Sequence, residues 1–182
     1  ALAHLVVHPS AGTAGYSRGQ FGAAWADVDH NGCDTRYDIL RRDLTNVTVK
    51  SDGHNCTVLS GDVTSPYTAK PVHFMRGGAS EIDIDHVVAL GDAWQTGAQT
   101  WSADKRLALA NDRLNLLAVD ASSNRAKGDS DAARWLPPNA AFRCRYVARQ
   151  VAVKKKYAAW VTTAERDAIR AVLKSCPTQP LP

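Results

Sequence analysis

Four widely spaced cysteines limit the folds open to this 182-residue chain more than any other feature of its sequence. None of them belongs to a Cys-x-x-Cys unit, which argues against a zinc knuckle or a thioredoxin-like redox site. An even number at wide spacing favours two disulfides and an oxidising compartment, and the alternative is four buried free thiols in a cytosolic protein. Three pairings can be drawn, of which we favour the local one, Cys33 with Cys56 and Cys144 with Cys176.

The length and composition predict one soluble globular domain. Hydrophobic residues make up 45% of the chain and charged residues 22%, both ordinary proportions, and no stretch approaches the ~18 uninterrupted apolar residues of a membrane span. Residues 1–20, rich in Gly, Ser and Ala, predict a flexible N-terminal arm ahead of a single domain over residues 21–182. The opening residues lack the basic and apolar segments of a signal peptide, as a mature secreted chain also would.

Positive charge gathers at the C-terminal end of the chain. Residues 131–182 contain ten Lys and Arg against three acids, whereas residues 1–130 carry a small negative excess. This distribution suits a protein that binds an anionic polymer with one part and a cation with another. The alternative is a solvated basic helix face, and the triplet Lys154-Lys155-Lys156 would spread around such a helix, so that only part of it could touch one duplex.

The pattern along the chain predicts a small α+β domain with its strands in the first two-thirds. Residues 21–43 suggest helix, loop and helix, with a turn at His30-Asn31-Gly32. The β-branched runs 47–49 and 57–59, separated by Ser51-Asp52-Gly53, predict a hairpin. In the second half, helices are expected after the capping residues Ser102, Asn139 and Thr162.

The segment from residue 81 to residue 129 contains the most informative pattern. Its first part alternates Ile with Asp and ends in Asp85-His86, which predicts a strand with one apolar and one acidic face. A second strand is expected from Asn115, followed by a helix that begins at Asn124 and is capped by Ser122 or Ser123. Singly, the histidine is more often a core residue and Asn124 a cap, but a strand pair packed on a helix would bring Asp85, His86 and Asn124 together.

This ordered set resembles the HNH nuclease motif, and it is similar to the variant found in the HNH domain of CRISPR-guided nucleases. That variant also has Asp-x-Asp-His, then Asn, then Asn-Arg-x-Lys, with Asn124 here at the position where other HNH proteins have His. The segments Phe21-Gly22-Ala23-Ala24-Trp25 and Gly32-Cys33-Asp34-Thr35-Arg36 resemble a family of secreted bacterial HNH endonucleases. The resemblance implies a ββα-metal core, or His-Me finger, within a small and mostly helical domain.

The resemblance also implies roles for individual residues. His86 would act as general base, since an imidazole can take a proton from water near neutral pH. Asn115 would brace the backbone that carries His86, and Lys127 would complete the catalytic set. Asp85 and Asn124 would supply hard oxygen ligands for one divalent metal ion, Mg²⁺ or alternatively Mn²⁺. Phosphates would contact Arg125 and Lys127, and also Arg36.

A second group of acidic residues has the spacing of a calcium loop. Asp27, Asp29, Asn31 and Gly32, followed by Asp38, fit the pattern except that Asp replaces the final Glu. Because Asp is shorter there and Cys33 lies inside the loop, we favour a turn rich in Asp and Asn over a Ca²⁺ site. The remaining histidines and the five Trp residues show no ligand-like or stacked spacing, and we expect them at the surface or in the core.

The sequence therefore predicts a secreted, extracellular, monomeric endonuclease that cuts DNA, or alternatively RNA, with little sequence specificity and no membrane association. Two other classes compete with this interpretation. The first is a secreted, non-catalytic module of the same fold that binds DNA or another polyanion. The second is a metal hydrolase acting on another phosphoester or on cell-wall material, although His-Glu-x-x-His and Gly-x-Ser-x-Gly motifs are absent from the sequence.

Overall fold

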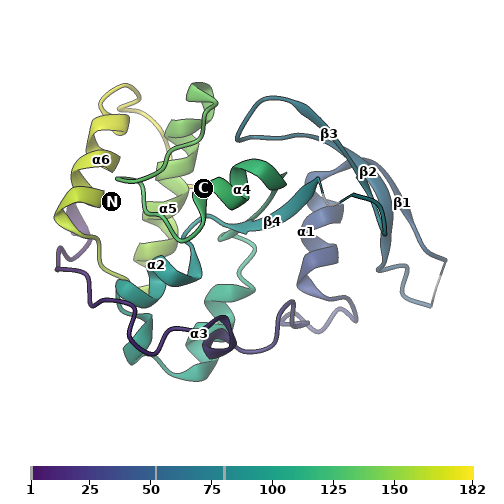
Figure 1. The fold of residues 1–182 in the computed structure, drawn as a ribbon, viewed down its shortest axis with the longest axis horizontal. Helices are drawn as coiled ribbons and strands as arrows, with labels where there is room; N and C mark the ends of the chain where they lie inside the picture. Colours follow the sequence, from purple (N-terminus) through teal and green to yellow (C-terminus); the bar gives the residue numbers. More distant parts are fainter. Residues whose placement is uncertain (1, 52, 80) are drawn as a thin grey trace.

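Two separate antiparallel sheets organise the chain. A computed structural model describes residues 2–51, 53–79 and 81–182. The first sheet has the order β1-β2-β3 and the second pairs β4 with β5 (Figure 1). The strands are β1 (Thr45–Val49), β2 (Val58–Thr64), β3 (Pro71–Met75), β4 (Ile82–His86) and β5 (Leu116–Asp120). The domain is therefore of mixed α and β composition, as predicted.

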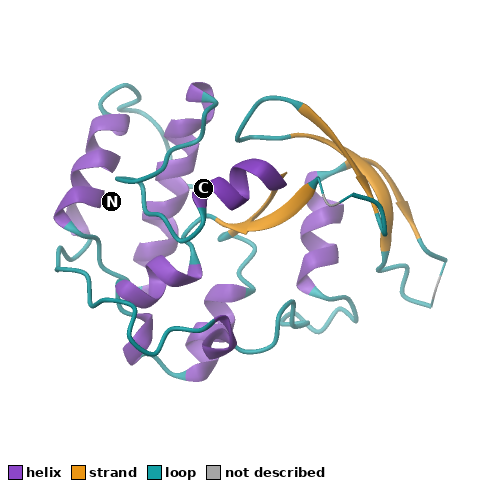
Figure 2. Cartoon of the chain, viewed as in Figure 1, coloured by secondary structure: helices purple, strands orange, loops and turns teal. Residues whose placement is uncertain are grey.

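Helices surround the second sheet and fill the other end of the molecule. In Figure 2 most helices gather on one side and the three-stranded sheet lies on the other, with β4 and α4 between them. The α-helices are α1 (Thr35–Asp43), α2 (Leu90–Gln95), α3 (Ala103–Ala110), α4 (Ala121–Lys127), α5 (Arg143–Tyr157) and α6 (Thr163–Leu173). Short 3-10 turns are η1 (Leu2–His4), η2 (Arg18–Phe21), η3 (Ala98–Thr100) and η4 (Ala140–Phe142).

The β4–β5 pair places its two faces in different surroundings. Its register sets Asp85 opposite Leu117 and His86 opposite Leu116. Since residues opposite one another share a face, His86 lies on the same side as Ile84 and Leu116, which pack against α1. Asp83 and Asp85 lie on the other side, where α4 crosses both strands. The two faces of one short strand therefore meet different parts of the fold.

Several predicted elements are confirmed and others shift. The first hairpin exists, with Val49 opposite Val58, although Asp52 of its predicted turn lies outside the described residues. Ser102 caps α3 and Thr162 caps α6 through their side chains. The expected helix–loop–helix over 21–43 is wrong in its first half, because only the turn η2 and then α1 are helical there.

The start of α4 also differs from the prediction. The helix begins at Ala121, because the Asp120 side chain accepts a hydrogen bond from the backbone N–H of Ser123 at 2.8 Å. Neither Ser122 nor Ser123 is the capping residue. Asn124 consequently lies in the middle of the helix, and Lys127 follows it one turn later on the same face.

The N-terminal residues contact the domain at several points of the segment predicted as a flexible arm, residues 1–20. Leu5 is buried in the main apolar cluster, and Val7 forms a parallel bridge with Val161. Further along, the Trp94 indole donates a hydrogen bond to the carbonyl of Ala14 at 3.1 Å. Apolar residues within the Gly- and Ser-rich segment supply this attachment.

Both disulfides follow the predicted local pairing. Cys33 bonds to Cys56 and Cys144 bonds to Cys176, with Cα atoms 5.3 and 6.4 Å apart. The first joins the approach to α1 to the approach to β2, and the second joins α5 to the segment after α6. Within the described residues, no helix combines the length and apolar character that crossing a membrane would require.

Candidate functional site

The imidazole of His86 is held in one orientation. Its Nε2 lies 2.8 Å from the carbonyl oxygen of Ala110, the last residue of α3. Because a carbonyl oxygen can only accept, Nε2 carries the hydrogen and Nδ1 has the lone pair. Nδ1 makes no hydrogen bond to the part of the chain that the structure describes. Burial lowers the pKa of His86 to about 4, so the ring is neutral at neutral pH.

A cavity of about 230 Å³ opens beside this histidine. The indole ring of Trp25 stacks on the imidazole, with centroids 5.9 Å apart and planes 10° apart. The other walls come from η2, the residues after it, the start of α2 and the end of α3. The sequence offered no reason to place Trp25 here, since only the fold brings residues 25 and 86 together.

Asp85 is fully engaged by protein groups. The ammonium of Lys127 lies 2.9 Å from one of its oxygens and 2.8 Å from the carbonyl oxygen of His86. The hydroxyl of Tyr67 donates a hydrogen bond to the other oxygen. Burial raises the pKa of Asp85 from its ordinary value, and the positive charge of Lys127 opposes that rise. Lys127 thus joins α4 to the end of β4, and Tyr67 was not anticipated from the sequence.

Asn124 contacts Asp83 and not Asp85. Its amide nitrogen donates to an Asp83 oxygen at 3.0 Å, and the Nε of Arg125 lies 3.7 Å from the same oxygen. The cause is the early start of α4, which sets Asn124 beside Asp83 and Lys127 beside Asp85. The predicted metal ligands Asp85 and Asn124 make no hydrogen bond to each other, and their role as ligands stays a prediction.

Asn115 clamps the backbone that follows His86. Its side-chain oxygen accepts from the N–H of Val88 at 2.8 Å, and its amide nitrogen donates to the carbonyl of Val88 at 3.2 Å. The backbone carbonyl of Asn115 also accepts from the N–H of Val87 at 2.8 Å. These contacts are the ones that the predicted bracing role of Asn115 requires.

The remaining predicted residues lie around α1. The guanidinium of Arg36 lies over the ring of Phe74 in β3, 5.9 Å from its centroid. In the acidic loop, the Asn31 side chain donates to Asp29 at 3.3 Å and to Asp38 at 3.1 Å, and the Asn31 backbone N–H donates to Asp27 at 3.1 Å. The loop is thus held by its own hydrogen bonds.

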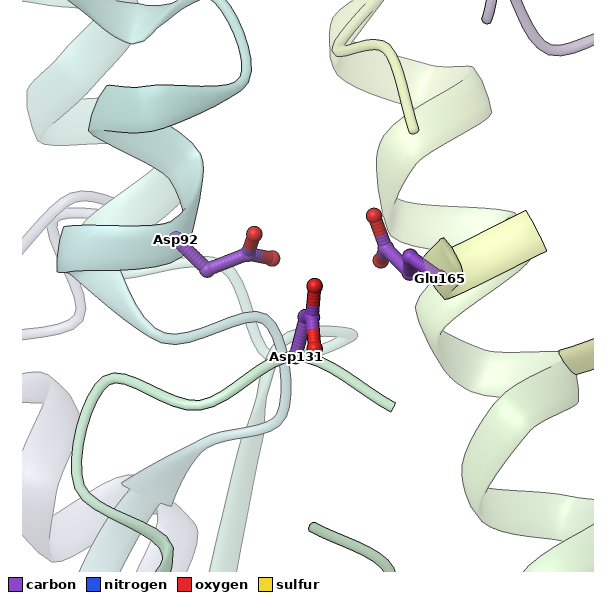
Figure 3. A group of neighbouring side chains, drawn as sticks. All are labelled: Asp92, Asp131 and Glu165. Atoms are coloured by element: carbon purple, nitrogen blue, oxygen red, sulfur yellow. The ribbon is translucent and has the colours of Figure 1, made fainter. Parts of the chain in front are cut away.

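A separate group of acidic residues surrounds Lys154. Asp92 from α2, Glu165 from α6 and Asp131 from the segment after α4 point toward one another (Figure 3), and one oxygen of each lies within 4.8 Å of the others. The buried ammonium of Lys154 lies 3.0 Å from Asp92 and 2.7 Å from Glu165. Burial and the charge of Asp92 raise the pKa of Glu165 to about 8. Lys154 is therefore a structural counter-ion, unavailable to a bound polyanion.

Comparison with known proteins identifies the class of protein. Residues 34–172 match the family described as GmrSD restriction endonucleases, C-terminal domain. The match covers most of the chain and includes β4, β5 and α4. The chain therefore belongs to this family, which is a nuclease family.

One relative and the solved structures complete the comparison. A protein of Arthroderma benhamiae described as an uncharacterized secreted protein is 40% identical over 177 residues, which is 96% of this chain and 82% of that protein. That relative is fungal, so the bacterial origin of the predicted family is not shown. No solved structure gives a significant match.

Proposed function

We propose that this chain is a metal-dependent endonuclease that hydrolyses phosphodiester bonds of DNA with little sequence preference, and that His86 is its general base. The nuclease family supports the class of reaction. The orientation of His86 supports its role: Nε2 donates to the Ala110 carbonyl, so Nδ1 presents a neutral acceptor at the wall of an open cavity. This observation carries the proposal.

The end of α3 assists the proton transfer. When Nδ1 takes a proton from the attacking water, the imidazole becomes a cation beside the last carbonyls of that helix, which carry partial negative charge. The negative charge of a bound phosphodiester acts in the same direction, and it moves the pKa of His86 upward toward the working range of a general base. In the free protein, the low pKa of His86 keeps its imidazole unprotonated until substrate binds.

The residues beside α4 can hold a divalent ion. Asp83, whose side chain is 24% exposed, and Asn124 together offer carboxylate and amide oxygens, the donors that Mg²⁺ and Mn²⁺ prefer. The chemistry that such an ion supplies when bound is neutralisation of charge on the phosphate and stabilisation of the departing 3′ oxygen. Asp85 fits less well, since a ligand role would require it to leave Lys127 and Tyr67; its role as a ligand stays a prediction.

The remaining basic residues divide by exposure. The side chain of Arg125 is 66% exposed beside Asp83, so we assign it to contact with substrate phosphate. Lys127 is fully buried, so its role is to hold Asp85 and the His86 carbonyl in place. Arg36 is assigned to the path of the nucleic acid over β3.

The wild-type protein provides the first test. Supercoiled plasmid, linear duplex, single strand and RNA are each incubated with Mg²⁺, Mn²⁺ or Ca²⁺, or with EDTA. Nicked and then linear plasmid in Mg²⁺ or Mn²⁺, with intact plasmid in EDTA, is the expected result. DNA that is retarded in a gel but never shortened under any metal would overturn the proposal and favour the non-catalytic binding module.

We also propose that the protein works outside the cell as a monomer. The Arthroderma benhamiae relative is described as secreted, and both disulfides favour an oxidising compartment. Detection of the protein in the culture medium and in the lysate of its native cells tests this placement. Recovery of the protein only in the lysate, with reduced cysteines, would contradict it.

A further inference from the structure

The cavity beside His86 has aromatic and apolar walls that proton transfer alone does not require. One wall holds the neutral imidazole, another holds the indole of Trp25, and Leu90 and Phe21 close the apolar back. Its volume of about 230 Å³ suits a single ring system and excludes a stacked duplex. The cavity therefore selects a small planar group presented out of a helix.

The backbone at Trp25 is held in a conformation that such a large residue rarely adopts. Its φ is +59°, in the left-handed region where a bulky side chain is strained. Strain of this kind persists where the surroundings over-determine it, and it clusters at ligand-binding sites. Here the strained backbone presents the indole to the cavity, where it stacks on His86.

A buried hydrogen-bond acceptor in the cavity wall also has no partner. Asn111, the residue after α3, is 1% exposed and donates through Nδ2 to the carbonyl of Leu107 at 3.0 Å. Its Oδ1 is buried and makes no hydrogen bond within the described residues. Asn111 lines this cavity and also a second hollow beside Leu107 and Tyr157, so its unpaired acceptor lies in the wall between the two.

The rim of the cavity carries positive charge. Arg18, the first residue of η2, is exposed and lines the cavity. Its charge contributes to lowering the pKa of His86, which places the guanidinium within electrostatic range of the imidazole. An anionic group at the mouth would therefore be attracted to the same cavity.

An aromatic surface and a cation at the mouth match two parts of a nucleotide, its flat base and its phosphate. We propose that this cavity is a subsite for one unpaired nucleotide of the strand being cleaved, with the base against Trp25 and the adjoining phosphate at Arg18. The inference rests on the proposed nuclease function and deepens it. It also predicts a preference for single strands over intact duplex.

Binding without cleavage tests the subsite directly. In EDTA, the affinity of the full-length protein is measured for a fluorescent octathymidylate and for an octamer of the same charge whose residues carry no bases. Loss of one stacked base typically costs roughly 5- to 150-fold in affinity. The wild type should bind octathymidylate more tightly by a factor in that range, and Trp25→Ala should bind both octamers equally.

Two further variants serve as controls. Trp160→Ala removes another indole that lies near a histidine, His8, at 4.9 Å between ring centroids, and it should keep the wild-type preference. Trp25→Phe retains an aromatic ring and should keep part of the preference for octathymidylate. It therefore tests the subsite even if the alanine variant misfolds. A wild type that binds both octamers equally, or a folded Trp25→Ala that keeps the full preference, would overturn the subsite.

The subsite and the nuclease function fail in different ways. Base-dependent binding by a wild type that cleaves nothing in any metal would leave the subsite standing and overturn the enzymatic proposal. Cleavage of plasmid without base-dependent binding would leave the enzymatic proposal standing and overturn the subsite.

Discussion

Neighbouring side chains of β4 meet different partners because they face opposite sides of a two-stranded sheet. His86 faces the cavity with Trp25 and the end of α3, while Asp85 faces Lys127 on α4. The alternation of Ile and Asp in the sequence predicts this division of faces. It does not predict which acid meets which residue of α4, because that depends on where the helix begins.

Replacing each of the two acids of β4 by Asn in separate variants distinguishes a role in metal binding from a role in stability. Asp83→Asn should leave stability nearly unchanged, since the side chain is partly exposed, and should weaken the apparent Mg²⁺ affinity in cleavage by at least about 10-fold. Asp85→Asn should destabilise the fold by about 3–5 kcal/mol, because it leaves the buried ammonium of Lys127 without its counter-charge.

Urea unfolding and the Mg²⁺ dependence of plasmid cleavage measure both effects. A stable Asp85→Asn that no longer responds to Mg²⁺, beside an Asp83→Asn with normal Mg²⁺ dependence, would assign the ligand to Asp85 instead.

At the level of elements, the sequence predicts β4, β5 and α4 in their correct order, but it predicts neither β3 nor the residue at which α4 begins. Strand, strand and helix follow one another in the predicted order, because alternation and β-branched runs are local properties. The strand β3 was missed, since it is short and begins with Pro71. The cap of α4 was assigned to serines although Asp120 competes for the same backbone groups.

The ion pairs of Lys154 could not be predicted, because their members come from separate parts of the chain. Thr162 and Glu165 have the spacing of a capping box, and the backbone N–H of Glu165 does bond to the Thr162 hydroxyl at 3.1 Å. The carboxylate of Glu165, however, turns to Lys154. This contact joins α5 to α6 through two buried side chains.

Burial and the charge of Asp92 outweigh the opposing attraction of Lys154 and raise the pKa of the Glu165 carboxyl. The folded protein should therefore lose stability as pH rises from the ordinary pKa of Glu165 to its raised value. Its pKa is about 8 in the folded protein and near 4.5 ordinarily, so the folded state holds a proton that the unfolded state releases above pH 4.5. The contribution of this proton to the free energy of unfolding is full below pH 4.5 and is lost by about pH 8. The free energy of unfolding in urea should fall less steeply over this range in Glu165→Gln than in wild type. Parallel curves for the two proteins would contradict this assignment.

For the whole molecule, each of the two disulfides joins a pair of neighbouring segments: the approach to α1 with the approach to β2, and α5 with the segment after α6. They close segments with sequence separations of 23 and 32 residues, each worth ~3–4 kcal/mol in the chain-entropy account. The docked N-terminal residues and the C-terminal helices depend on long-range contacts, which is why composition alone suggested a flexible arm.

Reduction should accordingly lower the melting temperature. Each double variant, Cys33→Ser with Cys56→Ser and Cys144→Ser with Cys176→Ser, should lose part of the stability that the reduced wild type loses in full. Thermal melts with and without reductant measure these differences. A wild type whose melting temperature does not respond to full reduction, verified by thiol titration, would contradict a stabilising role.

The proton-transfer role of His86 is the central claim, and one measurement tests it most directly. Single-turnover cleavage of plasmid in Mg²⁺ is compared for wild type, His86→Ala and His73→Ala, the last being an exposed histidine on the first sheet. His86→Ala should keep its fold, by circular dichroism, and lose about 10²- to 10⁴-fold in rate, with partial recovery in added imidazole. His73→Ala should cleave normally. A folded His86→Ala that cleaves at the wild-type rate would contradict the account.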